Sequence, residues 1–260
     1  MRRFHLTEIE DLAWCPTTIR DAATDYLEFA VTHLNPYPAL AALLGKLLRG
    51  AGTSHIVDLG AGAGGPWHGL LPALLADHPE VTLRLTDRYP NLHAWGELVT
   101  EFPGRVSYET RPIPATAIPP SLPGVRTLFN VLHHFEPPVA RSILEAAVQQ
   151  RQGIGAFEFM QRSPLSLAGA TLSPVAVLAA TPFIRPRRWS HLALTYLLPA
   201  VPAVVLWDGL VSSYRVYTPD ELIDLTRGLD DYVWAIGEAP LPRTPIPLTY
   251  LLGWPRQRPA

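Results

Sequence analysis

Cysteine and lysine are nearly absent from this chain of 260 residues, and both absences narrow its chemistry. The single cysteine, Cys15, excludes an internal disulfide and a cysteine-rich metal site, which fits a reducing cytosol. Cys15 itself is expected to be a small buried side chain. Lys46 is the only lysine among 21 basic residues, so most mechanisms that use a catalytic lysine are removed from consideration. The preference for arginine is typical of a GC-rich, bacterial-type coding sequence.

Charge is also scarce. Charged residues make up 17% of the chain, the net charge is −2, and the basic residues are spread out. This excludes the electrostatic footprint of a nucleic-acid-binding protein. The first residues, MRRFHLTEIEDLAW, place acids where a signal peptide would need an apolar run, which predicts a cytoplasmic protein. The 48% of apolar residues is enough for one large α/β domain, with or without an insertion.

Strand and helix patterns alternate through the middle of the chain. Short apolar runs that predict strands lie at residues 56–60, 81–87, 105–110, 126–132 and 153–160. Helical patterns separate them at residues 67–78, 91–102 and 137–150. This alternation predicts a parallel sheet with crossover helices. Two helices precede it, at 17–34 and 38–50, and a helix at 219–229 and strands at 231–239 and 247–255 follow it.

A glycine-rich stretch, HIVDLGAGAGGPW at residues 55–67, follows the first strand and opens a helix. Such a loop presents free backbone N–H groups, and its glycines let a ligand approach closely. Gly60, Gly62 and Gly65 spell the dinucleotide pattern GxGxxG, and Gly64 completes the alternative GxGxG. The Gly-Lys-Ser/Thr of a nucleoside triphosphate loop is missing.

Two aspartates at strand ends narrow the choice of ligand. Asp58 stands two residues before Gly60, where a carboxylate would repel a pyrophosphate but suits an ammonium group. Asp87 ends the next strand and can accept hydrogen bonds from ribose hydroxyls. S-adenosylmethionine has an ammonium, a sulfonium and a ribose, and no phosphate. For each aspartate the alternative is a solvated turn residue or a helix cap.

Three motifs in order, VDLGAGAGG, TDRYPN and RTLFNVLHHFEP, carry a family resemblance. The sequence resembles the class I S-adenosylmethionine-dependent methyltransferases over about residues 50–160 and the two closing strands. The resemblance implies a Rossmann-like, doubly wound seven-stranded sheet whose last strand is antiparallel, and S-adenosylmethionine as the cofactor. It implies that Asp58 lies beside the amino group and Asp87 holds the ribose. The other implied cofactor contacts are Gly60, Ala61, Gly62 and Gly64 at the methionine and ribose part, and Arg88 and Tyr89 at the adenine.

The adenine end departs from the family pattern. Many members carry an acid after the third strand, whereas this chain reads TRPIPATAIP, with Pro114 and Ala115 at that place. Backbone carbonyls or Thr116 are the available substitutes. Asn130 in the fourth strand and Tyr26 in the first helix complete the predicted cofactor contacts.

The predicted organisation has three parts: an N-terminal helical lid (1–50), the cofactor-binding core (51–162 and 218–260) and an apolar helical cap inserted after strand five (163–217). Residues 163–184 and 190–207 of the cap have no charged residue. Three interpretations are open for these segments. They could span a membrane, although prolines interrupt them, or lie on its surface through Arg185, Arg187, Arg188 and Trp189. The favoured interpretation is buried helices that roof the site or form a homodimer contact.

Five residues are candidates for catalysis. His133 and His134 end the fourth strand, where a histidine could accept a proton, although the pair could also serve packing alone. Glu158 ends the fifth strand and could orient a substrate donor or a histidine, cap a helix or pair with Arg162. Asp208 and Arg215 follow the uncharged segments, in the last part of the cap, and could bind substrate or pair as a clamp between cap and core.

Together these features predict a methyltransferase that acts on a small, lipophilic or aromatic acceptor by direct in-line displacement. No metal-ligand pattern is present in the sequence, and the Asn/Asp-Pro-Pro-Tyr/Phe signature of nucleic-acid base methylation is absent. A short-chain dehydrogenase would need Tyr-x-x-x-Lys, which the lone Lys46 does not complete. The alternatives that stay open are a protein that binds S-adenosylmethionine without methylating and a membrane-lipid methyltransferase.

Overall fold

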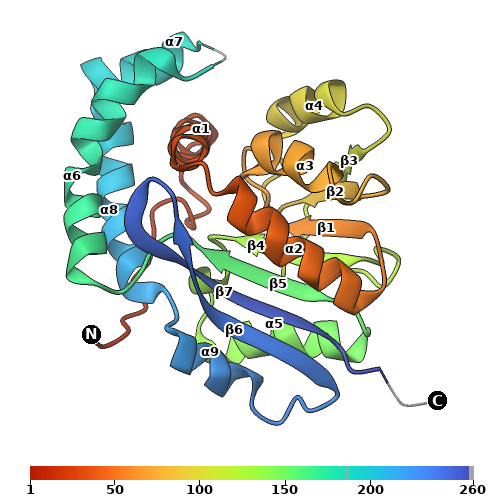
Figure 1. Cartoon of the computed structure of the whole chain (residues 1–260). Helices are drawn as coiled ribbons and strands as arrows, with labels where there is room; N and C mark the ends of the chain where they lie inside the picture. The colour runs from red at the N-terminus through yellow and green to blue at the C-terminus, as the bar shows by residue number, and fades with distance from the viewer. Residues whose placement is uncertain (186, 258–260) are drawn as a thin grey trace.

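One mixed sheet of seven strands organises the chain. The structure is a computed structural model and describes residues 1–185 and 187–257. The strands run in the order β3-β2-β1-β4-β5-β7-β6 (Figure 1), and their bounds are β1 His55–Leu59, β2 Thr82–Thr86, β3 Val106–Tyr108, β4 Val125–Phe129, β5 Ile154–Glu158, β6 Tyr232–Leu241 and β7 Thr244–Pro255. Strands β1 to β5 pair in parallel, and β7 is antiparallel to both β5 and β6. The predicted doubly wound fold is confirmed.

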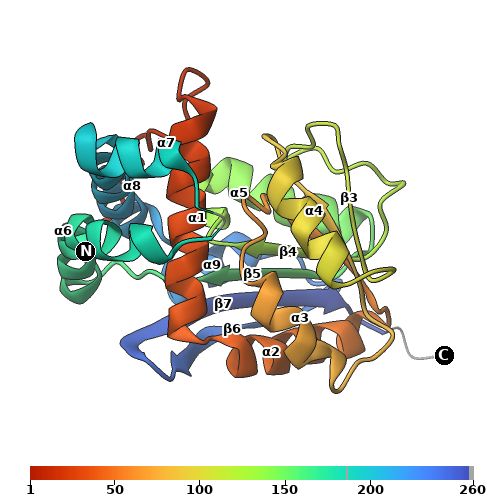
Figure 2. The same ribbon diagram turned by 90° about the horizontal axis from the view of Figure 1, so that it is seen from above.

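Helices cover both faces of this sheet, as Figures 1 and 2 show. On one face, α2 (Tyr37–Ala51), α3 (Trp67–Leu75) and α4 (Leu92–Glu101) bury leucines and tryptophans against the strands. On the other face, α5 (Pro137–Gln149) and α9 (Pro219–Thr226) complete a second apolar layer. Burial on both faces explains why the inner strands read as continuous apolar runs in the sequence.

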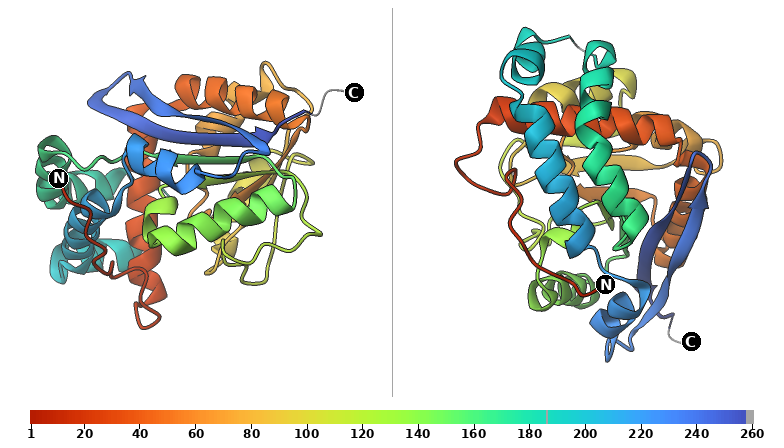
Figure 3. Two further views of the ribbon diagram at one scale, coloured as in Figure 1. Left: turned by 90° about the horizontal axis from the view of Figure 1, so that it is seen from below. Right: turned by 90° about the vertical axis from the view of Figure 1, so that its left-hand side faces the viewer.

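The cap is a layer of helices beyond the carboxyl ends of the parallel strands. It comprises α6 (Pro164–Ala180), α7 (Trp189–Leu192) and α8 (Ala200–Arg215), with the short turns η2 (Thr181–Phe183) and η3 (Ala193–Leu197). Helices α6 and α8 lie side by side (Figure 3). Helix α1 (Thr17–Leu34) runs between the cap and the core and shares a buried apolar cluster with both cap helices.

The favoured expectation of buried cap helices holds for only one side of α6. Ala170 and Val177 are buried, whereas Leu172 and Val175 on other sides of the helix are 65% and 66% exposed. Within the described residues, Pro164–Phe183 is the one helical segment whose length and apolar composition would suit a membrane crossing. The chain from Trp189 to Arg215 would count as a second only if its 78° bend belonged to a single span.

Residues 1–15 form no regular helix or strand and follow α8 back to the edge of the sheet (Figure 3). The backbone N–H of Phe4 donates to the carbonyl of Tyr214, and that of Ile9 donates to the carboxylate of Asp208. These contacts hold the N-terminal segment against α8.

Candidate active site at the carboxyl edge of the sheet

The glycine loop after β1 needs glycine for its backbone shape. Gly60, Gly62, Gly64 and Gly65 have φ values of 70°, 53°, 111° and 52°, a region that strains other residues. A Cβ on Gly60 would lie 2.9 Å from Cγ2 of Val131. The loop is tied to the end of β2, because the Gly62 N–H donates to Oδ2 of Asp87 at 2.9 Å. This creates a side-chain-free cradle at the edge where open α/β sheets bind ligands.

Asp58 is buried at the base of this loop. Its Oδ2 accepts from Nε1 of Trp67 at 2.8 Å, and its Oδ1 accepts from the hydroxyl of Thr127 at 2.5 Å. Burial raises the pKa of Asp58 to about 7, against the lowering effect of these two hydrogen bonds. Asp58 thus joins β1, β4 and the start of α3. Contact with a ligand amino group remains a prediction.

Asp87 organises the next part of the edge. Its Oδ1 accepts from the Tyr89 N–H at 2.7 Å, and burial raises its pKa. Its own carbonyl accepts from the Ile113 N–H at 2.8 Å, which brings the loop containing Pro114 and Ala115 alongside. The predicted ribose and adenine residues therefore share one end of the sheet.

Helix α1 lies against this end, and its predicted role as a lid stays a prediction. The Arg20 guanidinium lies 4.2 Å from the centre of the Tyr89 ring. Cγ2 of Thr24 lies 3.8 Å from the position that a Cβ on Gly62 would take. Tyr26, in contrast, is buried in the apolar cluster between α1 and the cap helices, so its packing serves to anchor the lid to the cap.

Asn130 connects the residues that follow β4 and β5. It has a φ of 54°, and its side-chain oxygen accepts from the Phe159 N–H at 2.8 Å. This bond fixes the turn that leads into the histidine pair.

His133 and Glu158 form a buried pair, and the orienting role considered for Glu158 stays a prediction. Nδ1 of His133 lies 2.7 Å from Oε2 of Glu158, and the backbone N–H of His133 donates to Oε1 at 3.2 Å. The two residues are only 3% and 2% exposed. Nε2 of His133 is buried and has no hydrogen-bond partner within the residues that the structure describes. The imidazole is therefore hydrogen-bonded to Glu158 at Nδ1, and no hydrogen bond is described at Nε2.

The N-terminal segment brings two acids to this pair that sequence reasoning missed. Oε1 of Glu8 lies 3.5 Å from Nε2 of His133, and Asp11 accepts at 2.8 Å from His134. Glu8 also accepts from the Ser212 hydroxyl at 2.9 Å. In the sequence, these two acids belong to no recognisable motif. No local spacing relates them to a motif so far along the chain.

Arg215 and Asp208 attach the N-terminal segment to α8. Arg215 donates to the carbonyls of His133 and His134 at 3.2 and 2.6 Å, and to Asp11 at 2.8 Å. Asp208 accepts from the backbone N–H groups of residues 9 and 10 at 2.6 and 3.2 Å. The described contacts are thus those of a clamp, with each residue bound to the N-terminal segment.

The acids and bases of this cluster stabilise each other's charged forms. Burial alone would lower the pKa of His133, but Glu158 and Glu8 raise it to about 10. Burial alone would raise the pKa of Glu8, but His134, His133 and Arg215 lower it to about 2. At neutral pH this arrangement favours a protonated His133 facing a charged Glu8. His133 can accept a proton only after this charge is removed or moved away.

The same cluster has the composition of a cation site. Glu8, His133 and His134 offer ligand atoms that lie within 4.8 Å of one another. However, Nη1 of Arg215 lies 3.3 Å from Oε1 of Glu8, so a guanidinium already supplies the positive charge that a metal ion would bring. The expectation that the site works without a metal stays a prediction.

The strand order, the antiparallel β7 and the glycine loop define the class I methyltransferase fold. The chain is similar to an O-methyltransferase family 2 protein from Planctomyces limnophilus solved with apigenin, at 17% identity over 91% of this chain and a TM-score of 0.52. It is also similar to the mitomycin 7-O-methyltransferase MmcR, at 17% identity over 86% and a TM-score of 0.50. The chain spans 62% and 54% of those two chains. At these identities the likeness establishes the fold. Neither a protein-family model nor a curated protein matches the sequence.

Proposed function

We propose that this protein transfers a methyl group from S-adenosylmethionine to a small molecule. The fold, the glycine cradle and the position of Asp87 support this assignment. The residues fit the group, because the cradle leaves room where side chains would collide and Asp87 lies beside it. The adenine end would rely on Tyr89 and on the backbone near Pro114. The structural neighbours support a small acceptor, since one is named as a mitomycin 7-O-methyltransferase and another is described in complex with apigenin.

The observation that carries the catalytic proposal is the one-sided binding of His133. Glu158 holds Nδ1, so Nε2 is the nitrogen that would receive a proton from an acceptor hydroxyl after Glu8 has moved away and His133 has become neutral. S-adenosylmethionine supplies a methyl group that its sulfonium makes reactive. The residues of the chain align the acceptor and exclude water, and once Glu8 has moved away and His133 is neutral, Nε2 of His133 takes up the hydroxyl proton. Arg215 and Asp11 act as positioning residues through His133 and His134.

The apolar cap supports a lipophilic or aromatic acceptor. Helices α1, α6 and α8 contribute a shared apolar cluster beside the carboxyl edge, with Ala22, Val177 and Val204 among its buried members. An acceptor that lies against this cluster would meet few polar partners, which favours an apolar one.

A second candidate is a protein that binds S-adenosylmethionine without transferring its methyl group. It is favoured by Glu8, whose carboxylate lies 3.5 Å from Nε2 of His133, on the nitrogen that an acceptor hydroxyl would need. Turnover distinguishes the two candidates, because only the first forms S-adenosylhomocysteine.

The test of the cofactor assignment is calorimetric titration with S-adenosylmethionine, S-adenosylhomocysteine and NADH. We expect the first two to bind the natural chain and to lose most of their affinity for Asp87→Ala. The control is Asp77→Ala, which changes an exposed aspartate outside the site. Binding of NADH alone, or equal affinities for the two variants, would reject the proposal.

A further inference from the structure

Exposed apolar side chains gather on one part of the cap. Among the described residues, eighteen large apolar side chains are exposed, and ten of them lie between Leu165 and Trp207. The most exposed are at the end formed by residues 183–185 and 187–198, which we call the tip. Phe183, Trp189, Leu197 and Leu198 are 68%, 86%, 85% and 64% exposed there. Isolated exposed side chains need no explanation, but four strongly exposed apolar side chains within sixteen residues of chain indicate an interaction surface.

The charge of this region is one-sided. Residues 159–207 contain no aspartate or glutamate, and they contain four arginines. Two of these, Arg185 and Arg187, are exposed on the tip next to the exposed tryptophan. A surface that combines arginines, tryptophan and leucines without acids complements a partner that is negatively charged outside and apolar beneath. An anionic bilayer has this composition.

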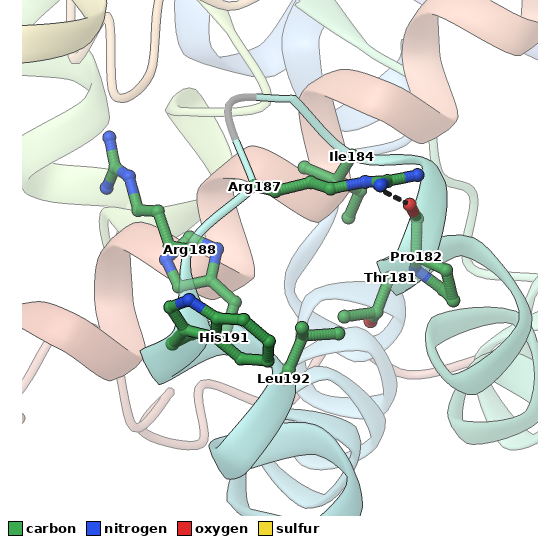
Figure 4. Close-up of a pocket in the computed structure, with 8 residues that line it drawn as sticks. Thr181, Pro182, Ile184, Arg187, Arg188, His191 and Leu192 are labelled. Carbon is green, nitrogen blue, oxygen red and sulfur yellow. Dashed lines mark hydrogen bonds between the residues drawn. The ribbon is translucent and has the colours of Figure 1, made fainter.

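The tip also contains a hollow that suits this chemistry. A cavity of about 410 Å³ is lined by residues of η2, α7 and the loop between them, and Figure 4 shows its lining residues. Ile184 and Leu192 contribute apolar walls, and Arg187 and Arg188 stand at the cavity. Arg187 donates to the Pro182 carbonyl at 3.3 Å, and Arg188 lies 3.9 Å from Asp21 and Asp25 of the lid. The guanidinium of Arg187 therefore has no acidic partner among the described ion pairs.

A second copy of the chain fits this surface less well. A symmetric dimer places the same patch against itself, so the tips would bring arginines together without an acid in residues 159–207 to neutralise them. Crossing of the bilayer by α6 is also disfavoured, because Ala170 and Val177 bury one side of this helix in the fold. Docking on one leaflet leaves those contacts intact.

We propose that the tip of the cap docks the protein on an anionic membrane surface, with Trp189 and Leu197 in the interface and Arg185 and Arg187 among the lipid phosphates. This inference does not depend on the proposed function. It concerns where the protein is located and not the reaction proposed for it.

The test is sedimentation of the full chain with phosphatidylcholine vesicles, with and without phosphatidylglycerol. We expect binding to the anionic vesicles that falls as salt is raised. Each arginine near such a surface strengthens binding by roughly fivefold, so the double variant Arg185→Glu/Arg187→Glu should bind at least about 25-fold more weakly. Its control is Arg105→Glu/Arg111→Glu, which makes the same charge change at exposed positions outside the cap.

A second pair of variants tests the apolar contribution without changing charge. Trp189→Ser/Leu197→Ser should lose vesicle binding, whereas Val139→Ser/Ile223→Ser, at exposed positions of α5 and α9, should retain it. Equal binding by tip and control variants, or a natural chain that stays in the supernatant, would overturn the proposal. So would a dimer in sedimentation velocity that dissociates in Trp189→Ser/Leu197→Ser. Titration of the tip variants with S-adenosylhomocysteine should match the natural chain, which separates this test from that of the proposed function.

Discussion

Oε1 of Glu8 lies 3.5 Å from Nε2 of His133, although one residue belongs to the N-terminal segment and the other follows β4. The contact places a carboxylate on the nitrogen that methyl transfer to a hydroxyl would use. It also makes the N-terminal segment part of the site. Two residues of α8 hold this segment in place, because Asp208 accepts from the Ile9 N–H and Arg215 donates to Asp11.

Replacing Glu8 by glutamine should lower the pKa of His133. Glu8 contributes to raising that pKa to about 10, so its neutral analogue should reduce the value by at least about one pH unit. The measurement is an NMR titration of the His133 imidazole, with the remote and exposed Glu80→Gln as the control. An unchanged titration would mean that Glu8 does not face His133 in solution. If a substrate is known, the acid limb of the kcat/KM profile should move to lower pH by the same amount.

The cluster should also make stability depend on pH. The folded-state pKa of His133, about 10, is above its unfolded value of 6.5. Its contribution is therefore full below about pH 6.5 and is lost as pH rises toward 10. The pKa of Glu8 is depressed from 4.5 to about 2, so its contribution is present above about pH 4.5 and is lost toward pH 2.

Urea unfolding as a function of pH measures this dependence. Between pH 7 and 10 the natural chain should lose stability, and Glu8→Gln should lose less over the same range. The control Glu80→Gln should follow the natural chain. Parallel curves for Glu8→Gln and the natural chain would contradict the coupling between Glu8 and His133.

The fold could be predicted because its signals are local. Apolar runs and helical spacing located the strands and helices between residues 55 and 160, and the glycine loop marked the carboxyl edge. Glu158 was considered as an orienting partner for a histidine, because strand ends of a parallel sheet converge. The contacts of Glu8 and Asp11 could not be predicted, since they depend on how a segment without regular structure returns to the sheet.

The exposure of the cap could not be predicted either. A helix reveals its buried side through a polar stripe on the opposite side. Helix α6 has no such stripe, because residues 163–184 are uncharged on all sides. Its sequence therefore could not separate Val177, which is buried, from Val175, which is 66% exposed.

Substitution of Gly60 should damage both stability and cofactor binding. In Gly60→Ala the positive φ is strained and the new Cβ meets Val131 at 2.9 Å, so the free energy of unfolding should fall by about 1–3 kcal/mol. The matched control is Gly96→Ala in α4, where a Cβ meets no atom within 4 Å and the protein should gain about 0.5–1 kcal/mol. Urea unfolding gives both values, and titration with S-adenosylhomocysteine should show weakened binding only for Gly60→Ala. Equal stabilities would contradict the described loop geometry.

Arg20 should couple the N-terminal segment to the adenine end of the site. It stacks on Tyr89 at 4.2 Å and donates to the carbonyls of Glu10 and Leu12 at 3.1 and 3.0 Å. Arg20→Ala removes these contacts together, so S-adenosylhomocysteine should bind about three- to tenfold more weakly. Limited proteolysis should also cut the segment before α1 faster than in the natural chain, because two of its carbonyls lose their donor.

The control for Arg20 is Arg49→Ala, an exposed arginine in the last turn of α2. It should leave both the affinity and the proteolysis rate unchanged. Weaker binding with unchanged proteolysis would limit the role of Arg20 to the contact with Tyr89. Faster proteolysis with unchanged binding would mean that the adenine end does not depend on the lid. Loss of both in one variant, and of neither in the control, is the result expected if α1 and the N-terminal segment close over the cofactor as one unit.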